Sequence, residues 1–384
     1  MWRRLEPASS GPIRLRRAAY SLIPLVLLFG LAEVIARLAG DPPEIQPGQA
    51  MEVMHTGMLP KNMMADPVIG WVGRPGAVII DSSLAQAAKV VGGPSEDPTT
   101  TRNDAWGHRD EDPPQSQGPG ARQVLLLGDS SMWGFGIPWE FSLERQLEKL
   151  SVQNGRPVDV IDGALPGWSS VQMLLALDRW LDAGLKADVV IAYLGVSDTM
   201  LTTSVPDEQW AGDALSRARP IFGQFASFRW ALALRDRFLP APRPTSGPRV
   251  TPAAAVDIAL GLNRRCQDAG AKLIVLVSTS PPDRDYRATE NPAVTDEASA
   301  AACEEVIRGT TSLTMPSPGA YRCASALAAY KGGFPRVDGP AAMRAEWATG
   351  AEGLFWDGIH PSSAGHGVLA RAVWPVLENA LPKP

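Results

Sequence analysis

The order of apolar and polar positions from Gln123 onward is typical of an α/β domain. Short, mostly apolar runs at 124–127, 158–161, 189–194 and 272–278, with a weaker one at 334–337, predict buried strands. Segments with helical spacing of apolar residues separate or follow them, at 140–150, 169–181, 252–269 and 367–381. Strands that alternate with helices form a parallel sheet covered on both faces. We therefore expect a three-layer α/β/α domain with a central, mostly parallel five-stranded sheet.

A long apolar segment lies near the N-terminus. Residues 18–38 form a stretch of 21 residues that is uncharged up to Glu33, and five arginines precede it against one acid (Arg3, Arg4, Arg14, Arg16 and Arg17 against Glu6). About 20 apolar residues suffice to cross a bilayer, and the basic flank normally stays in the cytoplasm. The pattern predicts a cytoplasmic basic tail at 1–17 and one N-terminal transmembrane helix at 18–38. It places the remaining chain outside the cytoplasmic membrane, on the periplasmic side. A cleaved signal peptide and a buried helix of a soluble protein are the alternatives.

The next eighty residues have no sustained period. Residues 39–120 are rich in Pro, Gly and polar side chains, with strand-like pieces at 70–72 and 77–80. We interpret them as an extracytoplasmic linker with a β-rich lead-in that packs partly on the main domain at 121–384.

Composition excludes several classes of protein. The net charge is −5, with 36 Lys and Arg against 41 Asp and Glu, and nucleic-acid binders usually show a basic excess. The three cysteines (Cys266, Cys303 and Cys323) form no C-x-x-C pair and are too few for a disulfide scaffold. An extracytoplasmic location would permit a disulfide between Cys303 and Cys323, a question that the sequence leaves open. Phosphate-loop, dinucleotide-binding and H-E-x-x-H patterns are missing, so no cofactor is implied.

Residues able to carry out acyl transfer gather at the expected strand ends. The first strand is followed by Gly128-Asp129-Ser130-Ser131, the second by a loop containing Gly167, and the third by Gly195-Val196-Ser197-Asp198. Asp357-Gly358-Ile359-His360 stands near the C-terminus. A serine after a strand, glycine-rich turns and an Asp-x-x-His supply a nucleophile, backbone donors, a base and the group that orients it. His366 is the only other histidine near this point, and the spacing of Asp357, His360 and His366 fits no common metal site.

These segments resemble the conserved blocks of the SGNH (GDSL-like) hydrolases over roughly residues 121–382. The resemblance implies a flavodoxin-like fold with Ser130 as nucleophile, His360 as base and Asp357 as its orienting acid. It also implies an oxyanion hole built from Ser130, Gly167 and Ser197. The third block of the family reads Gly-x-Asn-Asp, whereas this chain has Ser197 in place of the asparagine. Because a serine side chain is shorter, the expectation is a slow hydrolase or one with a substituted third donor.

Other residues near the blocks have a structural interpretation as well as a functional one. Ser131 is the alternative nucleophile, and His366 is expected to pack rather than to act as base. Asp129 is expected to be a structural hydrogen-bond partner. Trp133 and Trp168 could line a substrate pocket or simply pack at a loop edge. The segment 103–109 also resembles one that precedes the catalytic domain in membrane-anchored members of the family.

Three functions follow from this resemblance. The first is a membrane-anchored, extracytoplasmic serine esterase that cleaves an acyl ester through an acyl-enzyme. The second is an O-acyltransferase that passes an acyl group to cell-envelope glycans with the same residues, since only the acceptor differs. The third is a binding module that has lost catalysis, an alternative suggested by Ser197 in place of the asparagine of the third block. The partners expected are an acyl-ester substrate, such as an acylated envelope glycan or lipid, and the membrane through the N-terminal helix.

Overall fold

The computed structural model describes the chain in segments. They are residues 11–40, 62–66, 68–81, 99–110, 122–202, 206–208, 225–228, 230–231, 234, 247–279, 293–310 and 318–382. Contacts divide the chain into two compact units. One comprises Met1–Ile45 with Ala214–Ala241, and the other comprises Gln46–Asp213 with Pro242–Pro384.

The first unit is built around one long helix, α1 (Gly11–Leu38). Glu33 and Arg37 form an ion pair at 2.8 Å, and the Glu33 carboxylate also accepts the amides of Ala226 and Ser227. No helix in the described part of the chain combines the length and the apolar character of a membrane span. The transmembrane anchor expected at 18–38 is therefore not found among these described residues.

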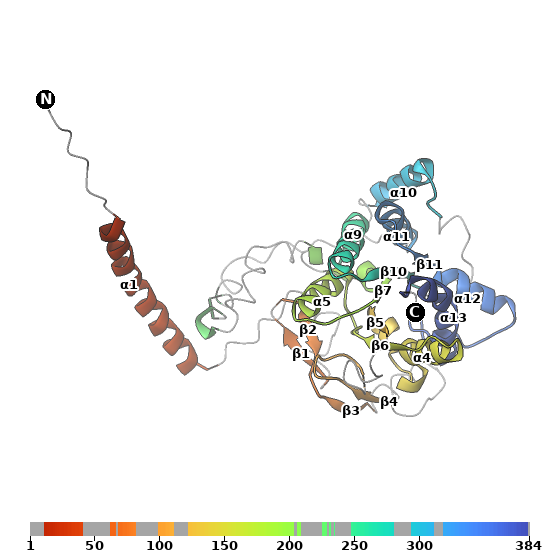
Figure 1. Cartoon of the computed structure of the whole chain (residues 1–384), viewed down its shortest axis with the longest axis horizontal. Coiled ribbons are helices and arrows are strands. Elements are labelled where there is room, and N and C mark those ends of the chain that lie inside the picture. The colour runs from red at the N-terminus through yellow and green to blue at the C-terminus, as the bar shows by residue number, and fades with distance from the viewer. Residues whose placement is uncertain are drawn as a thin grey trace. The chain divides into compact units, whose positions relative to one another are not determined.

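The second unit has the expected central sheet (Figure 1). Its five strands are all parallel and lie in the order β11-β10-β7-β5-β6. Their bounds are β5 Arg122–Leu127, β6 Val158–Asp162, β7 Val189–Leu194, β10 Lys272–Val277 and β11 Arg336–Val337. The prediction of a five-stranded parallel sheet is confirmed, with each strand within a residue or two of the expected run.

Helices cover both faces of this sheet, because successive side chains of a buried strand point to opposite sides. Leu125 and Leu127 of β5 enter one apolar cluster, and Val124 and Leu126 enter the other. The first cluster contains side chains of α5 (Ser170–Asp182), α9 (Pro252–Asp268), α10 (Glu297–Thr310) and α11 (Pro318–Gly332). The second contains side chains of α4 (Leu143–Gln153), α12 (Gly339–Ala348) and α13 (Ser363–Ala380). The three-layer α/β/α prediction is therefore confirmed.

Side-chain caps fix where several of these helices begin. The hydroxyls of Ser142, Thr251 and Ser362 accept amides from the first turns of α4, α9 and α13, which satisfies donors that lack an intrahelical partner. Residues 140–142, expected as the start of a helix, instead lie in or directly after a 3₁₀ turn (Trp139–Phe141). Helices α10, α11 and α12 lie between residues 279 and 366, where the apolar pattern predicts no helix. In α10 and α11, the sulfurs of Cys303 and Cys323 are 2.8 Å apart, and both are free thiols.

The lead-in segment forms small antiparallel pairs, as the strand-like pieces predicted. Strand β1 (Met63–Asp66) pairs with β2 (Gly70–Gly73), and β3 (Val78–Asp81) pairs with β4 (Thr99–Arg102). A further short pair joins β8 (Leu201–Thr202) to β9 (Gly247–Pro248). Because β6, β5 and β7 are neighbours and parallel, the loops after their carboxyl ends meet at one edge of the sheet.

Candidate active site

A sharp turn after β5 places Ser130 at this edge. Ser130 opens the four-residue helix α3 (Ser130–Trp133), and the Asp129 carboxylate caps it by accepting the Ser131 amide at 2.9 Å. Gly128 has no room for a side chain, because a Cβ there would lie 2.3 Å from the Cβ of Met132. The turn can close this tightly only with glycine before the Asp129-Ser130 pair.

Ser130, His360 and Asp357 form a continuous hydrogen-bonded series. His360 Nε2 lies 2.8 Å from Ser130 Oγ, and His360 Nδ1 lies 2.6 Å from Asp357 Oδ2. The other Asp357 oxygen accepts the amides of Ile359 and His360 at 2.7 and 2.6 Å. Burial alone would raise the pKa of Asp357. The His360 hydrogen bond and charge, together with the two amides, outweigh it and hold that pKa below its ordinary value. Asp357 is therefore an anion facing the imidazole.

Aromatic rings fix the plane of the His360 imidazole. Trp356 stacks on it with ring centres 5.4 Å apart, and Phe135 lies 4.8 Å away. The Trp356 indole N–H donates to the Phe135 carbonyl at 2.7 Å, which ties the two rings to each other. His360 is consequently held between the turn after α3 and its own loop.

The backbone amides of Ser130 and Gly167, in the loops after β5 and β6, remain available as donors. Among the described residues, no acceptor takes the amide hydrogens of Ser130 and Gly167. Gly167 adopts a φ of +78°, a conformation that favours glycine. These are the two backbone donors that the resemblance implied.

Ser197, which the resemblance implied as a third oxyanion donor, contacts Asp129 in this structure. Its hydroxyl donates to Asp129 Oδ2 at 2.9 Å, and its amide donates to the same oxygen at 3.1 Å. A serine hydroxyl has one hydrogen to donate, so this arrangement uses it on Asp129. The role of Ser197 as a third oxyanion donor stays a prediction, and in this structure its side chain reaches the carboxylate at the nucleophile turn. Asp129 is the structural hydrogen-bond partner that the sequence suggested.

The residues considered as alternative nucleophile, base or pocket lining are all buried and do not take part in the series formed by Ser130, His360 and Asp357. Ser131 is 1% exposed, and His360 contacts Ser130 instead. His366 is fully buried in α13, where burial lowers its pKa to about 3 and keeps it neutral. Trp133 and Trp168 are at most 3% exposed and pack inside the protein, Trp133 beneath the guanidinium of Arg109.

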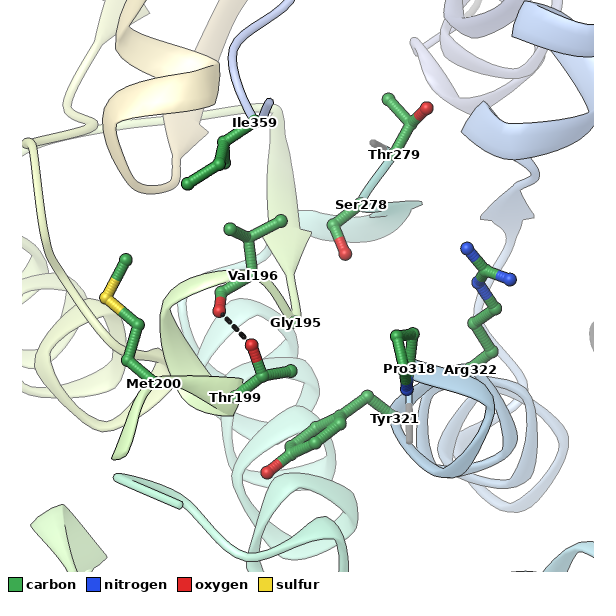
Figure 2. Close-up of a pocket in the computed structure, with 10 residues that line it drawn as sticks. All are labelled: Gly195, Val196, Thr199, Met200, Ser278, Thr279, Pro318, Tyr321, Arg322 and Ile359. Carbon is green, nitrogen blue, oxygen red and sulfur yellow. Dashed lines mark hydrogen bonds between the residues drawn. The ribbon is translucent and has the colours of Figure 1, made fainter. Parts of the chain in front are cut away.

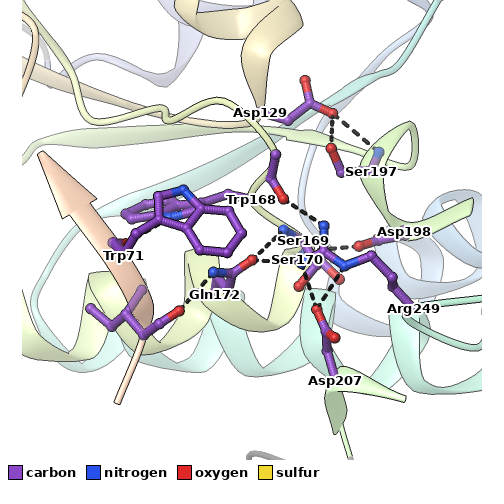
Figure 3. A network of polar contacts seen from close by, with 12 residues as sticks. Trp71, Asp129, Trp168, Ser169, Ser170, Gln172, Ser197, Asp198, Asp207 and Arg249 are labelled. Atoms are coloured by element: carbon purple, nitrogen blue, oxygen red, sulfur yellow. Dashed lines mark hydrogen bonds and ion pairs between the residues drawn. The ribbon is translucent and has the colours of Figure 1, made fainter. Parts of the chain in front are cut away.

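Sequence reasoning gave no role to Arg109, Trp71 or Arg249, which all hold the loops of this site. The Arg109 guanidinium donates to the carbonyl of Trp133, the last residue of α3. Trp71 and Arg249 contact the Gly167 loop, as Figure 3 shows. A tryptophan in a short strand and an arginine between two loops give no periodic signal, so only the fold brings them to Gly167.

A pocket is lined in part by residues that follow β7 and β10 (Figure 2). Its volume is about 220 Å³, and Ile359 and Val196, which line it, directly precede His360 and Ser197 in the chain. Figure 2 shows the side chains of Ile359, Val196 and Met200 at one end and those of Ser278 and Arg322 at the other. The described residues contain no cluster of three or more His, Cys, Asp or Glu side chains arranged to hold a metal ion.

Comparison with known proteins finds similarity in solved structures alone. No family model and no curated protein sequence matches the chain. TesA is 18% identical, with 68% of this chain and 100% of that chain covered and a TM-score of 0.40. A member of the lipolytic G-D-S-L family from Veillonella parvula is 12% identical, covering 67% and 99%, with a TM-score of 0.38. Axe2, an acetyl xylan esterase from Geobacillus stearothermophilus, is 16% identical, covering 70% and 99%, with a TM-score of 0.38.

Proposed function

We propose that this chain hydrolyses acyl esters through Ser130, His360 and Asp357. The observation that carries the proposal is the unbroken hydrogen-bonded series from Ser130 Oγ through the imidazole to the Asp357 carboxylate. The same order of groups activates a serine in acyl-transfer enzymes. A binding module would have no need for a stacked imidazole between a serine and a carboxylate.

Each residue then has a defined step. Ser130 Oγ forms a bond to the ester carbonyl carbon while His360 Nε2 takes its proton. The carbonyl oxygen becomes an oxyanion, which the amides of Ser130 and Gly167 stabilise. As the C–O bond of the alcohol breaks, His360 returns the proton to the leaving oxygen. Water then attacks the acyl carbon while His360 takes its proton, and His360 returns that proton to Ser130 Oγ as the bond between Oγ and the acyl carbon breaks and the acid leaves.

The pocket supports a substrate with a short acyl chain. Its volume of about 220 Å³ is larger than the cavity of about 150 Å³ that binds benzene in another protein. A chain of a few carbons fits between Val196, Met200 and Ile359, next to the carbonyl that Ser130 would attack.

The test is hydrolysis of p-nitrophenyl butyrate by the full chain. We expect measurable turnover that Ser130→Ala reduces by several orders of magnitude, because the nucleophile is lost. Ser131→Ala is the matched control, since it removes a neighbouring hydroxyl that does not contact His360, and it should keep the wild-type rate. Comparable rates in Ser130→Ala and wild type would refute the assignment. Turnover that requires an added sugar hydroxyl as acceptor would turn the proposal to acyl transfer.

We also propose that the second unit works on the outer side of the cytoplasmic membrane. The charge pattern supports this, with five arginines before the apolar stretch of α1 and a mostly acidic segment after it. An alkaline phosphatase fused after Pro384 should be active in cells, and an inactive fusion would contradict the location. Carbonate washing of membranes and the mass of the mature chain separate a retained protein from a released, cleaved one.

A further inference from the structure

The Gly167 loop is held by side chains from two distant segments. The Trp71 indole Nε1 donates to the Pro166 carbonyl at 3.1 Å, and Arg249 Nη1 donates to the Gly167 carbonyl at 2.5 Å. Trp71 lies in β2, 95 residues before Pro166, and Arg249 follows β9. The peptide groups on both sides of Gly167 therefore each have an oxygen fixed by a donor from a buried side chain.

The bond to Pro166 determines where the Gly167 amide points. The Pro166 carbonyl and the Gly167 N–H belong to one planar peptide group, and the described chain has no cis peptide bond. In a planar trans peptide the C=O and N–H point in opposite directions. A donor that holds the Pro166 oxygen on the Trp71 side thus turns the Gly167 hydrogen to the opposite side.

Glycine makes such a restraint necessary. Gly167 has a φ of +78°, and a residue without Cβ occupies positive and negative φ about equally well. The peptide before it could therefore rotate and take the amide hydrogen away from the oxyanion. The Trp71 ring also closes the space beside Gly167, because a Cβ there would lie 3.2 Å from Trp71 Cζ2.

Trp71 is itself rigidly held. Its side chain is fully buried, and its carbonyl accepts the Trp168 indole N–H at 3.0 Å. Together with the bond from the Trp71 indole to Pro166, this joins β2 to the Gly167 loop in both directions. Gln172 of α5 donates to the Ile69 carbonyl at 2.6 Å. Arg179 of α5 binds Asp66 through two bonds of 2.6 and 2.9 Å. The β1–β2 pair is thus attached firmly to the helix that follows the Gly167 loop.

Arg249, the second side chain that holds the Gly167 loop, is equally constrained. Arg249 is 1% exposed, and Asp207 Oδ2 accepts from both its Nε and Nη2, at 3.1 and 2.8 Å. Its Nη2 also donates to Gln172 Oε1 at 2.7 Å. Gln172 therefore touches both the Arg249 guanidinium and the lead-in strand pair.

We propose that Trp71 is a positioning residue for the reaction, whose indole N–H directs the Gly167 amide into the oxyanion hole. The inference rests on the proposed function. In this proposal the β1–β2 pair contributes to catalysis by holding Trp71. Without Trp71, the site would keep Ser130, His360 and Asp357, but the peptide that carries the Gly167 amide could rotate.

The test replaces Trp71 with β-(3-benzothienyl)alanine, which keeps the shape of the ring and lacks the N–H. We expect kcat for p-nitrophenyl butyrate to fall roughly 10- to 100-fold with KM nearly unchanged, since one oxyanion donor is worth up to about 10³. The inhibition constant of butylboronic acid, whose tetrahedral adduct places an oxygen in the oxyanion hole, should rise by a similar factor. Trp180→Phe is the control, because it alters another buried tryptophan near this loop without touching the Pro166 carbonyl. It should leave kcat and the inhibition constant unchanged.

The outcomes separate the two proposals. A wild-type rate and wild-type boronate affinity in the benzothienyl variant would overturn the positioning role and leave the esterase proposal intact. The positioning role would also be overturned if the benzothienyl variant and Trp180→Phe lost activity and thermal stability to the same extent. Disturbed packing would then explain the effect. Wild-type protein without any esterase activity would overturn both proposals.

Discussion

The Ser197 hydroxyl donates to Asp129 Oδ2 at 2.9 Å, and the Ser197 amide donates to the same oxygen at 3.1 Å. The third loop is thereby tied to the turn that carries Ser130. Burial raises the pKa of Asp129, while the hydrogen bonds from Ser131 and Ser197 lower it, and the balance is a pKa above the ordinary value. We therefore expect Ser197 to act on the nucleophile turn through Asp129 rather than on the substrate.

A Ser197→Ala variant distinguishes these two roles. It removes one of three hydrogen bonds to Asp129, so we expect a loss of about 1 kcal/mol in the free energy of unfolding. Turnover of p-nitrophenyl butyrate should fall less than about tenfold, whereas loss of a direct oxyanion donor typically costs about 10²–10³. Urea denaturation and steady-state kinetics of the purified protein measure both quantities. A fall in turnover of several hundredfold would instead indicate that Ser197 donates directly to the oxyanion.

Asp357→Asn should impair catalysis far more than folding. The amide can still accept from the Ile359 and His360 amides, but it supplies no negative charge to His360 Nδ1 and favours the wrong imidazole tautomer. In another serine hydrolase the equivalent change lowers kcat about 10⁴-fold, and we expect a loss of about 10³–10⁴ here. Asp296→Asn, at the exposed start of α10, is the control for an Asp-to-Asn change in a capping carboxylate. Equal activity of the two variants would argue against the role of Asp357.

The sequence predicted the parts of this molecule that depend on local pattern. The buried strands and the Asp357-x-x-His360 turn are continuous in the chain, so their apolar runs and spacing are visible there. Trp71, Arg109 and Arg249 act through contacts between residues far apart in the chain, and nothing in their neighbours along the sequence indicates those contacts. Ser197 shows a different limit. Its position was correctly placed at the end of β7, but a hydroxyl has several acceptors within reach, and the surrounding fold decides which one it bonds.

Asp198 should make the stability of the protein depend on pH. Burial raises its pKa to about 7, although its Oδ1 accepts the Ser170 amide at 2.7 Å. A raised pKa means that the folded state prefers the neutral acid. This stabilisation is complete below the pKa of the unfolded chain and is lost as the pH rises through about 7.

Asp198→Asn isolates this contribution. The variant stays neutral, so it should gain stability relative to wild type as the pH rises from 4 to 8, by an amount on the order of a few kcal/mol. The other buried carboxyls titrate in both proteins and cancel in the difference. Urea denaturation at each pH measures it. A difference that stays constant with pH would contradict the raised pKa of Asp198.

The pocket beside His360 should set the preferred length of the acyl chain. A volume of about 220 Å³ accommodates chains of between about four and eight carbons, judged against cavities of known occupancy. We expect kcat/KM to be highest for esters in this range and to fall for the palmitate.

Val196→Trp provides the sharper measurement. Val196 lines the pocket, and an indole there would fill the space near Met200 and Ile359. One methylene in an apolar pocket is worth roughly 10- to 200-fold in discrimination, so kcat/KM for the octanoate should fall by at least about tenfold. The acetate, which needs little of the pocket, should change by less than about threefold. Val152→Trp, at an exposed position of α4, should leave the whole profile unchanged. Equal losses for acetate and octanoate in Val196→Trp would instead mean that the substitution disturbs the Ser197 loop, and the acyl chain would have to bind elsewhere.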